Sequence, residues 1–554
     1  MKKLIPTFIL IVWLATACQW TKISSFPTPT PAGSTLPSSA GAAQSDSQSS
    51  GSSLPGTPLP TATPRPTPEA GGVATLGLIG QPESLNPLLD DSSAMRELTP
   101  LLFDTLLRVD PQTAELQPGL AESWDFSMSG RHLSLHLPAG LRWSNGTPLT
   151  AESLKQSLEA TRHPALLAFS QITVPDDHTL KLTFTRVDCS AVTALAQVPL
   201  IPASQDLDEQ PLGSGPFRAV NRYTQAGELT LTRNPYYHGA PAYLDELHLR
   251  FFPDSAAAEI ALNEGQFDAV GPFDPFVSNP APNELLLLAY PEARVYFMAL
   301  NFAPRNETPL SLPVRRALTL ALDREAILTE ALGDDGQLTA GSLLPEHWAN
   351  PADLAIPAYD PEQARRLLAQ AGLRDSDLDG WLDRDGQRLE LQLRLNGENS
   401  LHQNLGWLIS SYYRDLGLYV RTSSGAAESV IDDLFTHDFE LALFSWPILP
   451  DPDQRLFWHS TENREGEGLN FVSYRNPELD RLLDRGANLP GCRGEQRAEL
   501  YTQVQQALNR DRPVDFLLIP NRHLFVAQRL MGLEPGPFAP LTWNASQWHV
   551  QREP

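Results

Sequence analysis

The stretch Pro118–Leu158 constrains the fold of this chain more than any other part of the sequence. Every second residue of Leu133–Leu137 is leucine, which places three apolar side chains on one face of a strand. Asn145–Gly146 is a hairpin-type signal, because both residues tolerate positive φ. Thr150 is suited to cap a helix with leucines at i, i+4 spacing. The stretch predicts strand, turn, strand, turn and helix, and it assigns no chemistry.

Length and composition indicate a folded protein with more than one domain. At 554 residues the chain exceeds the size at which a single apolar core stops growing. The hydrophobic fraction is 41% and the charged fraction is 19%, as in folded soluble proteins. The formal net charge of -25 argues against nucleic-acid binding, because no basic surplus is available to neutralise phosphates. We attribute the acidity to solubility rather than to a metal-binding role.

Residues 1–18 have the pattern of an export signal. Lys2 and Lys3 precede the apolar run Leu4–Leu14, which is too short to span a membrane comfortably as a mature helix, and small residues lead to Cys18. The pattern resembles a bacterial lipoprotein signal, which implies that Cys18 is lipidated and becomes the mature N-terminus. Ala15 stands where such signals usually carry leucine. An ordinary cleaved signal peptide and an uncleaved anchor are therefore the alternatives.

The next segment, residues 19–72, is rich in Ser, Thr, Pro, Gly and Ala and has almost no large apolar residues. Such a segment buries too little surface to offset the entropy of ordering it. We expect an extended, disordered tether with polyproline character that holds the folded part away from a membrane.

Cys189 and Cys492 are the two remaining cysteines. An exported protein can form disulfides, but two cysteines so far apart in sequence more often stay buried and free. We expect free thiols and leave pairing open. Two cysteines are too few for a four-thiolate metal site.

The two longest apolar patterns predict helices. Met95–Val109 and Leu312–Leu332 carry apolar residues at helical spacing, and Phe439–Trp446 reads as a buried strand.

Several motifs, in this order, resemble those of the extracellular solute-binding proteins of family 5, the oligopeptide, dipeptide and nickel receptors of ABC importers. They are PGLAESW from Pro118, GSGPF from Gly213, VRRALTLALDREAI from Val314, YDPEQARRLLAQAG from Tyr359 and NPELDRLLDRGA from Asn476. With further weaker motifs the resemblance covers residues 73–535, essentially the whole exported part.

The resemblance implies an α/β fold of the two-lobed periplasmic-binding-protein type, in its large peptide-binding class (type II). Both lobes are expected to contain mixed sheets, and a hinge closes a ligand cleft between them. We expect lobe I at residues 73–294 with an inserted subdomain at about 110–205, lobe II at residues 295–520, and a C-terminal return to lobe I at residues 521–554.

The resemblance also implies a function. We expect a monomeric lipoprotein, anchored to the outer face of the cytoplasmic membrane, that captures oligopeptides or a similar polar solute and delivers them to ABC permease subunits. The alternatives are a ligand-sensing receptor without transport and a binder of a nickel chelate or an oligosaccharide. We expect no required cofactor and no enzymatic activity, because zinc-protease, P-loop and nucleophile-elbow motifs are absent from the sequence.

One departure from the family pattern bears on the solute. Peptide-binding members commonly carry Asp three residues after the tryptophan that corresponds to Trp446, where it pairs with the α-ammonium group of the ligand. This chain has Leu449 at that position. A buried ammonium group without a partner is costly, so Leu449 weakens the free-peptide interpretation. We name Trp446 as an aromatic wall of the ligand site and Asp451 as a charge anchor.

Fold position in the family supplies the other ligand-binding candidates, which are Glu83, Ser84, Asn86, Gly213, Gly215, Asn301 and Asn396. A structural turn or a core position explains each of them equally well.

An acidic loop raises the question of a metal. Asp375, Asp377 and Asp379 have the D-x-D-x-D-G spacing of a calcium loop, with Asp383 at the ninth position. The twelfth position, where a bidentate Glu belongs, is Gly386. A structural calcium site and an acidic turn without metal are the two interpretations.

Overall fold

The computed structural model describes residues 68–161, 163–203, 211–220, 227–263, 265, 267–274, 285–303 and 310–551. Apart from Pro68, they belong to the compact unit that contains Glu69–Pro554. No helix in these ranges is long and apolar enough to cross a membrane. Cys18 and most of the predicted tether lie outside the described residues.

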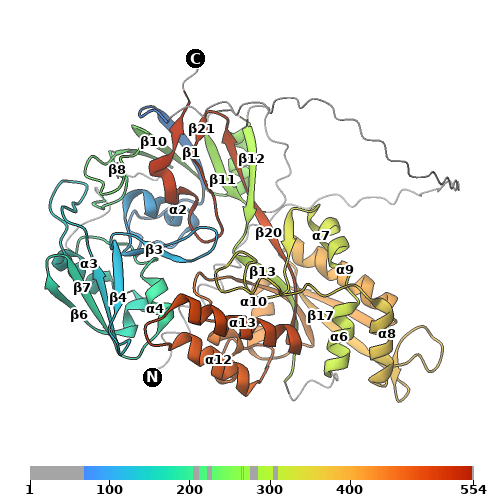
Figure 1. Ribbon diagram of the computed structural model, residues 1–554. Coiled ribbons are helices and arrows are strands. Elements are labelled where there is room, and N and C mark those ends of the chain that lie inside the picture. The colour runs from blue at the N-terminus through green and yellow to red at the C-terminus, as the bar shows by residue number, and fades with distance from the viewer. Residues whose placement is uncertain are drawn as a thin grey trace, which may run out of the picture. The chain divides into compact units, whose positions relative to one another are not determined.

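A twelve-stranded mixed sheet forms the frame of the described residues (Figure 1). Its strand order is β18-β17-β19-β13-β20-β11-β1-β10-β9-β8, and β12 and β14 pair with β20 beside this path. The bounds are β1 (Val73–Ile79), β8 (Phe217–Ala219), β9 (Glu228–Arg233), β10 (Glu246–Phe252), β11 (Ala269–Phe273), β12 (Leu285–Pro291), β13 (Arg294–Leu300), β14 (Gly336–Leu338), β17 (Glu390–Asn396), β18 (Tyr419–Gly425), β19 (Leu441–Pro447) and β20 (Val514–Ala527).

The long strand β20 belongs to both halves of this sheet. Its residues up to Pro520 pair with β13 and β14, and its residues from Asn521 onward pair with β11 and β12. We call the part with β13, β17, β18 and β19 the β13 half, and the part with β1 and β8–β12 the β1 half. The predicted boundary between lobe II and the C-terminal return lies at the same place, and the domain boundaries stay predictions.

Helices cover both faces of the β13 half. Side chains of β13 alternate between an apolar core shared with α10, α11, α12 and α13 and a second core shared with α6–α9, as strand geometry requires. The helix bounds are α2 (Ser93–Leu102), α3 (Ala151–Thr161), α4 (Cys189–Ala194), α5 (Ser255–Leu262), α6 (Leu312–Leu320), α7 (Arg324–Leu332), α8 (Pro361–Gln370), α9 (Ser400–Asp415), α10 (Ala427–Phe435), α11 (Arg455–Trp458), α12 (Pro477–Ala487) and α13 (Gly494–Asp511), with the 3₁₀ turns η1 (Pro164–Ala168), η2 (Ser460–Glu462) and η3 (Leu541–Gln547).

Two predicted helices differ from the structure. The helix predicted over Met95–Val109 ends at Leu102, because Phe103 has an extended backbone and the end of the stretch pairs as strand β2 (Leu107–Val109) with β3 (Leu116–Pro118). The pattern over Leu312–Leu332 is divided into α6 and α7, since the Asp323 side chain caps a new helix by accepting from the N–H of Ala326 at 3.1 Å.

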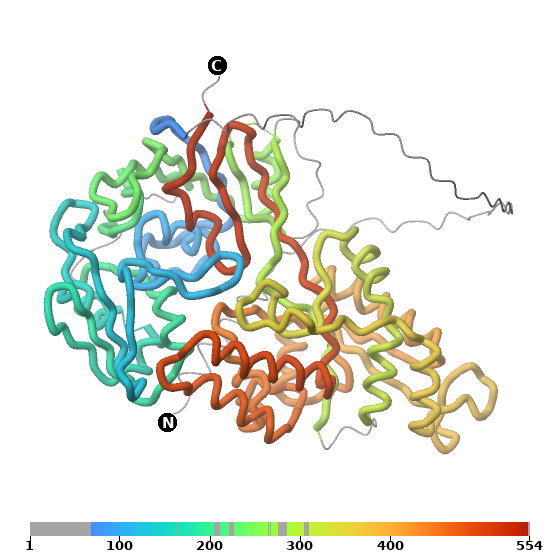
Figure 2. Tube along the Cα trace, viewed as in Figure 1, coloured from blue at the N-terminus to red at the C-terminus, as the bar shows by residue number. Residues whose placement is uncertain are grey.

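A separate four-stranded sheet, with order β4-β5-β7-β6, has its own apolar core with α3 and α4. We call this part the four-stranded body; it occupies the blue-green region of the trace in Figure 2. The predicted alternation in Leu133–Leu137 is confirmed, because its three leucines are buried in this core. The remaining short strands are β2 (Leu107–Val109), β3 (Leu116–Pro118), β4 (Ser123–Phe126), β5 (His132–His136), β6 (Phe169–Asp176), β7 (Thr179–Phe184), β15 (Asp383–Arg384), β16 (Gln387–Arg388), β21 (Leu530–Met531) and β22 (His549–Val550).

The expectation that the two cysteines remain free is wrong. Cys189 and Cys492 form a disulfide across a sequence separation of 303 residues. The fold brings their Cα atoms to 5.4 Å, within the range that a disulfide spans. Sequence separation was a poor guide, because it does not limit which helices pack together.

Candidate functional site

The loop after β1, which contains Glu83, Ser84 and Asn86, is organised around a carboxylate. Asp90 Oδ2 accepts hydrogen bonds from the N–H groups of Glu83 at 2.5 Å and Ser84 at 3.3 Å, and Asp90 Oδ1 accepts from the N–H of Ser92 at 2.8 Å. Burial opposes ionisation of Asp90, yet these hydrogen bonds leave its pKa below the ordinary value. The N–H of Asn86 donates to the Ser84 hydroxyl at 3.0 Å. The loop is therefore held by its own backbone at the N-terminal side of α2.

Gly213 and Gly215 lie against the other end of α2. A Cβ atom at Gly213 would be 1.8 Å from the carbonyl oxygen of Leu102, and one at Gly215 would be 2.6 Å from the Leu102 carbonyl carbon. The N–H of Gly215 donates to the same carbonyl oxygen at 3.0 Å. The backbone at both glycines therefore packs closely against the end of α2, and their predicted contact with a ligand stays a prediction.

Asn301 and Asn396 tie loops to strand ends. The Asn301 side chain is 2% exposed, and its amide nitrogen donates to the carbonyl oxygens of His437 at 2.8 Å and Phe439 at 2.7 Å. Asn396, the last residue of β17, accepts from the N–H of Glu398 at 2.9 Å. Both amides fix the backbone beside strand ends of the β13 half, and these ends lie at opposite edges of the sheet, because β13 runs antiparallel and β17 parallel to β19.

Trp446 lies in an aromatic cluster on β19. Its ring stacks on Phe457 with centroids 4.4 Å apart and lies 4.3 Å from the ring of Phe297. The apolar cavity beside it has a volume of about 10 Å³, room for about one water molecule. Trp446 thus packs as a core residue, with 4% of its surface exposed.

Asp451 has a strong partner inside the protein. Its carboxylate accepts two hydrogen bonds from the Arg497 guanidinium, at 2.9 and 2.7 Å, and a third from the Thr193 hydroxyl at 2.7 Å. The two charged side chains are 8% and 4% exposed. Burial opposes ionisation, but the adjacent guanidinium holds the pKa of Asp451 below its ordinary value. The Asp451 carboxylate is therefore paired with an arginine and a hydroxyl of the protein itself, whereas the sequence suggested that it pairs with a charged group of the ligand.

These candidates fall into separate groups. The loop at Glu83 and the two glycines lie at opposite ends of α2, whereas Trp446 and Asp451 follow one another on and after β19. Their predicted contacts with a ligand stay predictions.

A group of ionisable side chains that the sequence did not single out lies where β20 passes between the halves. We call it the junction cluster, and it consists of Glu97, Asp274, Tyr290, Glu292, Arg294 and Arg522. Glu292 Oε1 accepts from Arg294 Nε at 3.2 Å and from Arg522 Nη2 at 3.4 Å. Asp274 Oδ1 is 4.0 Å from the same Arg522 nitrogen.

Two carboxyl groups of the junction cluster are strongly perturbed. Burial raises the pKa of Glu97 to about 7, against opposing contributions from the N–H of Thr542 and the charge of Arg522. Burial likewise raises the pKa of Asp274 to about 7. Glu97 Oε2 and Arg522 Nε are buried and make no hydrogen bond. Perturbed carboxyls beside an arginine are typical of functional sites, and these groups are suited to bind charge rather than to form a covalent bond.

A signal for the junction cluster existed in the sequence. Glu292 and Arg294 interrupt the apolar run of β12 and β13, and Arg522 interrupts that of β20. Charged residues inside otherwise apolar strands are rarely buried unless they are paired.

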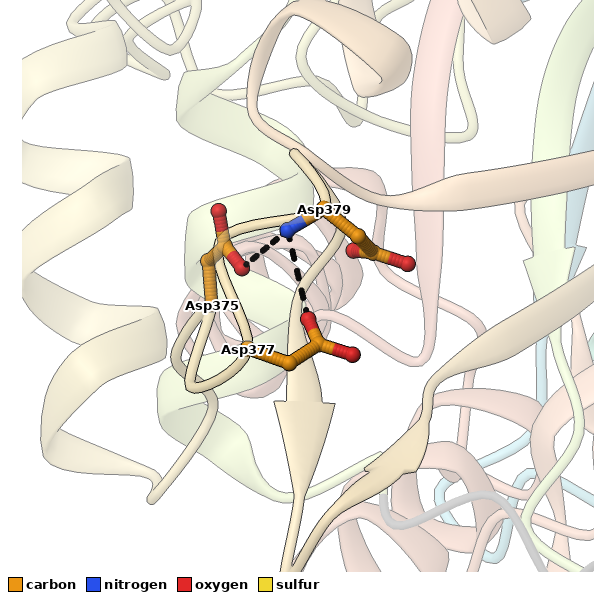
Figure 3. Close-up of side chains that lie close together, drawn as sticks. All are labelled: Asp375, Asp377 and Asp379. Carbon is orange, nitrogen blue, oxygen red and sulfur yellow. Dashed lines mark hydrogen bonds between the residues drawn. The ribbon is translucent and has the colours of Figure 1, made fainter.

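The acidic loop brings three carboxylates together (Figure 3). Asp375, Asp377 and Asp379 each offer one oxygen, and these atoms lie within 4.8 Å of one another. Asp379 also pairs with Arg388, and Asp383 instead accepts from the N–H and the hydroxyl of Ser376, both at 2.7 Å. Carboxylate oxygens suit calcium, but the diversion of Asp383 reduces the four candidate ligands to three, and the Arg388 guanidinium competes with an ion for Asp379. Calcium binding stays a prediction.

Comparison with known families matches residues 115–467 to the model of "Bacterial extracellular solute-binding proteins, family 5 Middle". The chain is 26% identical over 514 residues to the oligopeptide-binding protein AppA of Bacillus subtilis, covering 88% of this chain and 93% of AppA. It is 24% identical over 498 residues to the probable D,D-dipeptide-binding periplasmic protein DdpA of Escherichia coli, covering 85% and 92% of the two chains.

Solved structures show the same fold over most of the chain. AppA from Bacillus subtilis in complex with a nonapeptide superposes with a TM-score of 0.63 at 25% identity, covering 88% of this chain and 100% of AppA. NikZ from Campylobacter jejuni in complex with Ni(L-His) gives 0.65 at 24% identity, covering 86% and 99%. HbpA2 from Haemophilus parasuis gives 0.74 at 17% identity, covering 87% and 100%. These neighbours are two-lobed binding proteins, so the predicted fold class is confirmed.

Proposed function

The chain belongs to the bacterial extracellular solute-binding proteins of family 5, and from that premise we propose that it captures oligopeptides or a similar polar solute for an ABC importer. The observation that carries the proposal is its likeness, over 88% of its length, to an oligopeptide-binding protein whose structure holds a nonapeptide. Proteins of this family act outside the cytoplasm, and the solute-binding role applies to this chain.

The strand topology supports binding beside β20. Ligands of open α/β sheets bind outside the carboxyl ends of parallel strands. In the β1 half, β1 runs parallel to β10 and β11, and Asp274 directly follows β11. In the β13 half, β17 and β19 run parallel, and Arg294 pairs with Pro447 at the carboxyl end of β19. We propose that residues of the junction cluster contact the solute, since they bring charged groups from both halves to this edge.

The segment after Trp446 bears on which class of solute is the best candidate. Leu449 removes the carboxylate that family members use for an α-ammonium group, and Asp451 is bound by Arg497. A free peptide would therefore have to place its ammonium group elsewhere, and the raised pKa values of Glu97 and Asp274 mark carboxyls that a cation would ionise. Peptides remain the first candidate; a nickel chelate, as in NikZ, and an oligosaccharide are the second.

We propose that lipidation of Cys18 anchors the protein to the outer face of the cytoplasmic membrane and that it acts as a monomer beside its permease. A receptor that senses solute without transport is the alternative. We propose no catalytic activity, because the family is one of binding proteins.

A titration of the full chain tests the proposal. The Cys189–Cys492 disulfide is first reduced and the reductant is removed. Tryptophan fluorescence is then followed while a peptide pool, a nickel–histidine chelate or an oligosaccharide mixture is added, and we expect a saturable change with the peptide pool. Arg522→Gln should weaken the affinity for the peptide pool at least tenfold. Arg421 is an exposed arginine that pairs with Glu390, far from β20 in the sheet order, and Arg421→Gln should leave the affinity unchanged. No response to any of the three classes would contradict the proposal. An unchanged affinity in Arg522→Gln would contradict the role of the junction cluster.

A further inference from the structure

The disulfide joins two parts of the molecule that have separate apolar cores. Cys189 opens α4 and is 1% exposed beside the core of the four-stranded body. Cys492 lies in the turn between α12 and α13, whose apolar side chains pack in the core of the β13 half. Cys492 itself also packs against the core of the four-stranded body. Cys492 therefore reaches from the turn into the four-stranded body, which carries Cys189.

The four-stranded body is attached to the β1 half by its own backbone. The N–H of Leu200 donates to the carbonyl oxygen of Asp104 at 2.9 Å, and the N–H of Ser144 donates to that of Gly213 at 2.8 Å. A link from this body to α12 and α13 is consequently a link between the β1 half and the β13 half. The other covalent passages between the halves are the strand β20 and the connection from β12 to β13.

Polar contacts surround the disulfide on both sides. Thr193 of α4 donates to Asp451, and Asp188 lies 3.6 Å from Arg455. Close to the bonded turn, a Cβ atom at Gly130 would lie 2.7 Å from the backbone nitrogen of Gly491. Figure 1 shows α4 beside α12 at the lower left, away from β20, the strand that belongs to both halves. The Asp188–Arg455 ion pair is partly exposed and the Thr193–Asp451 hydrogen bond is buried; both are non-covalent and can be replaced by contacts with water when the parts separate, whereas the disulfide cannot.

We propose that Cys189 and Cys492 form a redox-operated latch that holds the two halves closed as a disulfide and lets them separate for solute exchange once it is reduced. The proposal rests on the proposed function, because a binder that works by hinge closure must open to load and release its solute. The disulfide lies away from β20, and a link at a distance from the axis opposes rotation of the halves about β20 more effectively than a link close to it.

The reductant belongs to the class of dithiols that act on exported proteins. Cys492 is the more exposed of the two residues, so a thiolate of the reductant attacks its sulfur. A mixed disulfide with Cys492 forms, the Cys189–Cys492 bond breaks, and Cys189 leaves as a thiolate that takes up a proton. The second thiol of the reductant then displaces Cys492. The protein gains two thiols, and the reductant becomes a disulfide.

Hydrogen–deuterium exchange of the full chain tests the latch without any solute. The oxidised protein, the protein treated with dithiothreitol, and Cys189→Ser with Cys492→Ser are compared. We expect amides at residues 189–195 and 489–493 to exchange at least tenfold faster in the reduced protein and in the double variant. Amides of β5 and β7, inside the four-stranded body, should be unchanged, which separates release of the latch from unfolding.

Release of a bound peptide pool tests the gate. We expect the dissociation rate, followed by tryptophan fluorescence, to be at least tenfold higher in the reduced protein and in the double variant. Equal amide exchange in the three forms, or equal dissociation rates, would overturn the latch. If the amides respond to reduction but no form binds any solute, the latch stands as a clasp between the halves and the proposed function fails.

Discussion

Replacement of Asp451 by alanine separates a structural role from a ligand-binding role. The carboxylate is 8% exposed and receives two hydrogen bonds from Arg497, which is 4% exposed, and one from Thr193. Its loss leaves a buried guanidinium without a counter-charge, which typically costs about 3–5 kcal/mol. The Glu390–Arg421 pair is a matched control, because its side chains are 46% and 66% exposed. Removal of Glu390 should cost less than about 1 kcal/mol.

The assay is urea unfolding at pH 7 without solute, followed by tryptophan fluorescence. We expect Asp451→Ala to lower the unfolding midpoint clearly, and Arg497→Met in the same chain to restore part of the loss, because it removes the unpaired charge. The lowered pKa of Asp451 means that the pair stabilises the fold above the ordinary range of aspartate and that this contribution is lost as pH falls through the lower folded value. An unchanged midpoint together with a lost response to peptides would refute this reasoning and make Asp451 the ligand anchor.

Three further predictions concern other sites. Burial lowers the pKa of His402 to about 3, so the unfolded chain binds the proton more tightly than the folded chain does and the free energy of unfolding falls as the pH drops below about 6.5. In urea unfolding, the free energy that His402→Gln loses between pH 7 and pH 5 should be about 2 kcal/mol smaller than the loss in the parent protein. An equal loss in the two proteins would contradict this prediction. Gly213→Ala places a Cβ atom 1.8 Å from the Leu102 carbonyl oxygen and should lower the free energy of unfolding by about 3 kcal/mol or more. The control Gly494→Ala has open space at the Cβ position and should change the free energy of unfolding by about 0.5 kcal/mol. Similar thermal midpoints for the two variants would contradict the close packing at Gly213. Calcium should bind the acidic loop with a Kd of about 1 mM by calorimetry and not bind Asp377→Asn, and the absence of any heat in the parent protein would leave the acidic turn without a metal.

The sequence predicted local structure well where side chains alternate or repeat. The leucines of Leu133–Leu137 and the apolar run ending at Trp446 form buried strands, because strand periodicity is a local property. The pattern over Met95–Val109 failed at its end, since pairing of β2 with β3 outweighs helical propensity. The division of Leu312–Leu332 depends on a single capping aspartate inside a continuous apolar pattern.

Long-range partnerships were beyond the sequence. Cys189 and Cys492 meet only because α4 packs against α12. Arg497 reaches Asp451 from α13, which is distant in sequence, so the motif position of Asp451 gave no warning that its charge was already paired. The junction cluster draws its members from four separate stretches, at Glu97, Asp274, Tyr290–Arg294 and Arg522, which sequence order does not associate.

We propose that this chain binds solute between two halves that move about β20. Small-angle X-ray scattering of the full chain, reduced and then mixed with a saturating peptide pool, measures this motion most directly. We expect the radius of gyration to rise on reduction and to fall again when the pool binds. A radius that stays the same in the oxidised, reduced and peptide-saturated protein would contradict it.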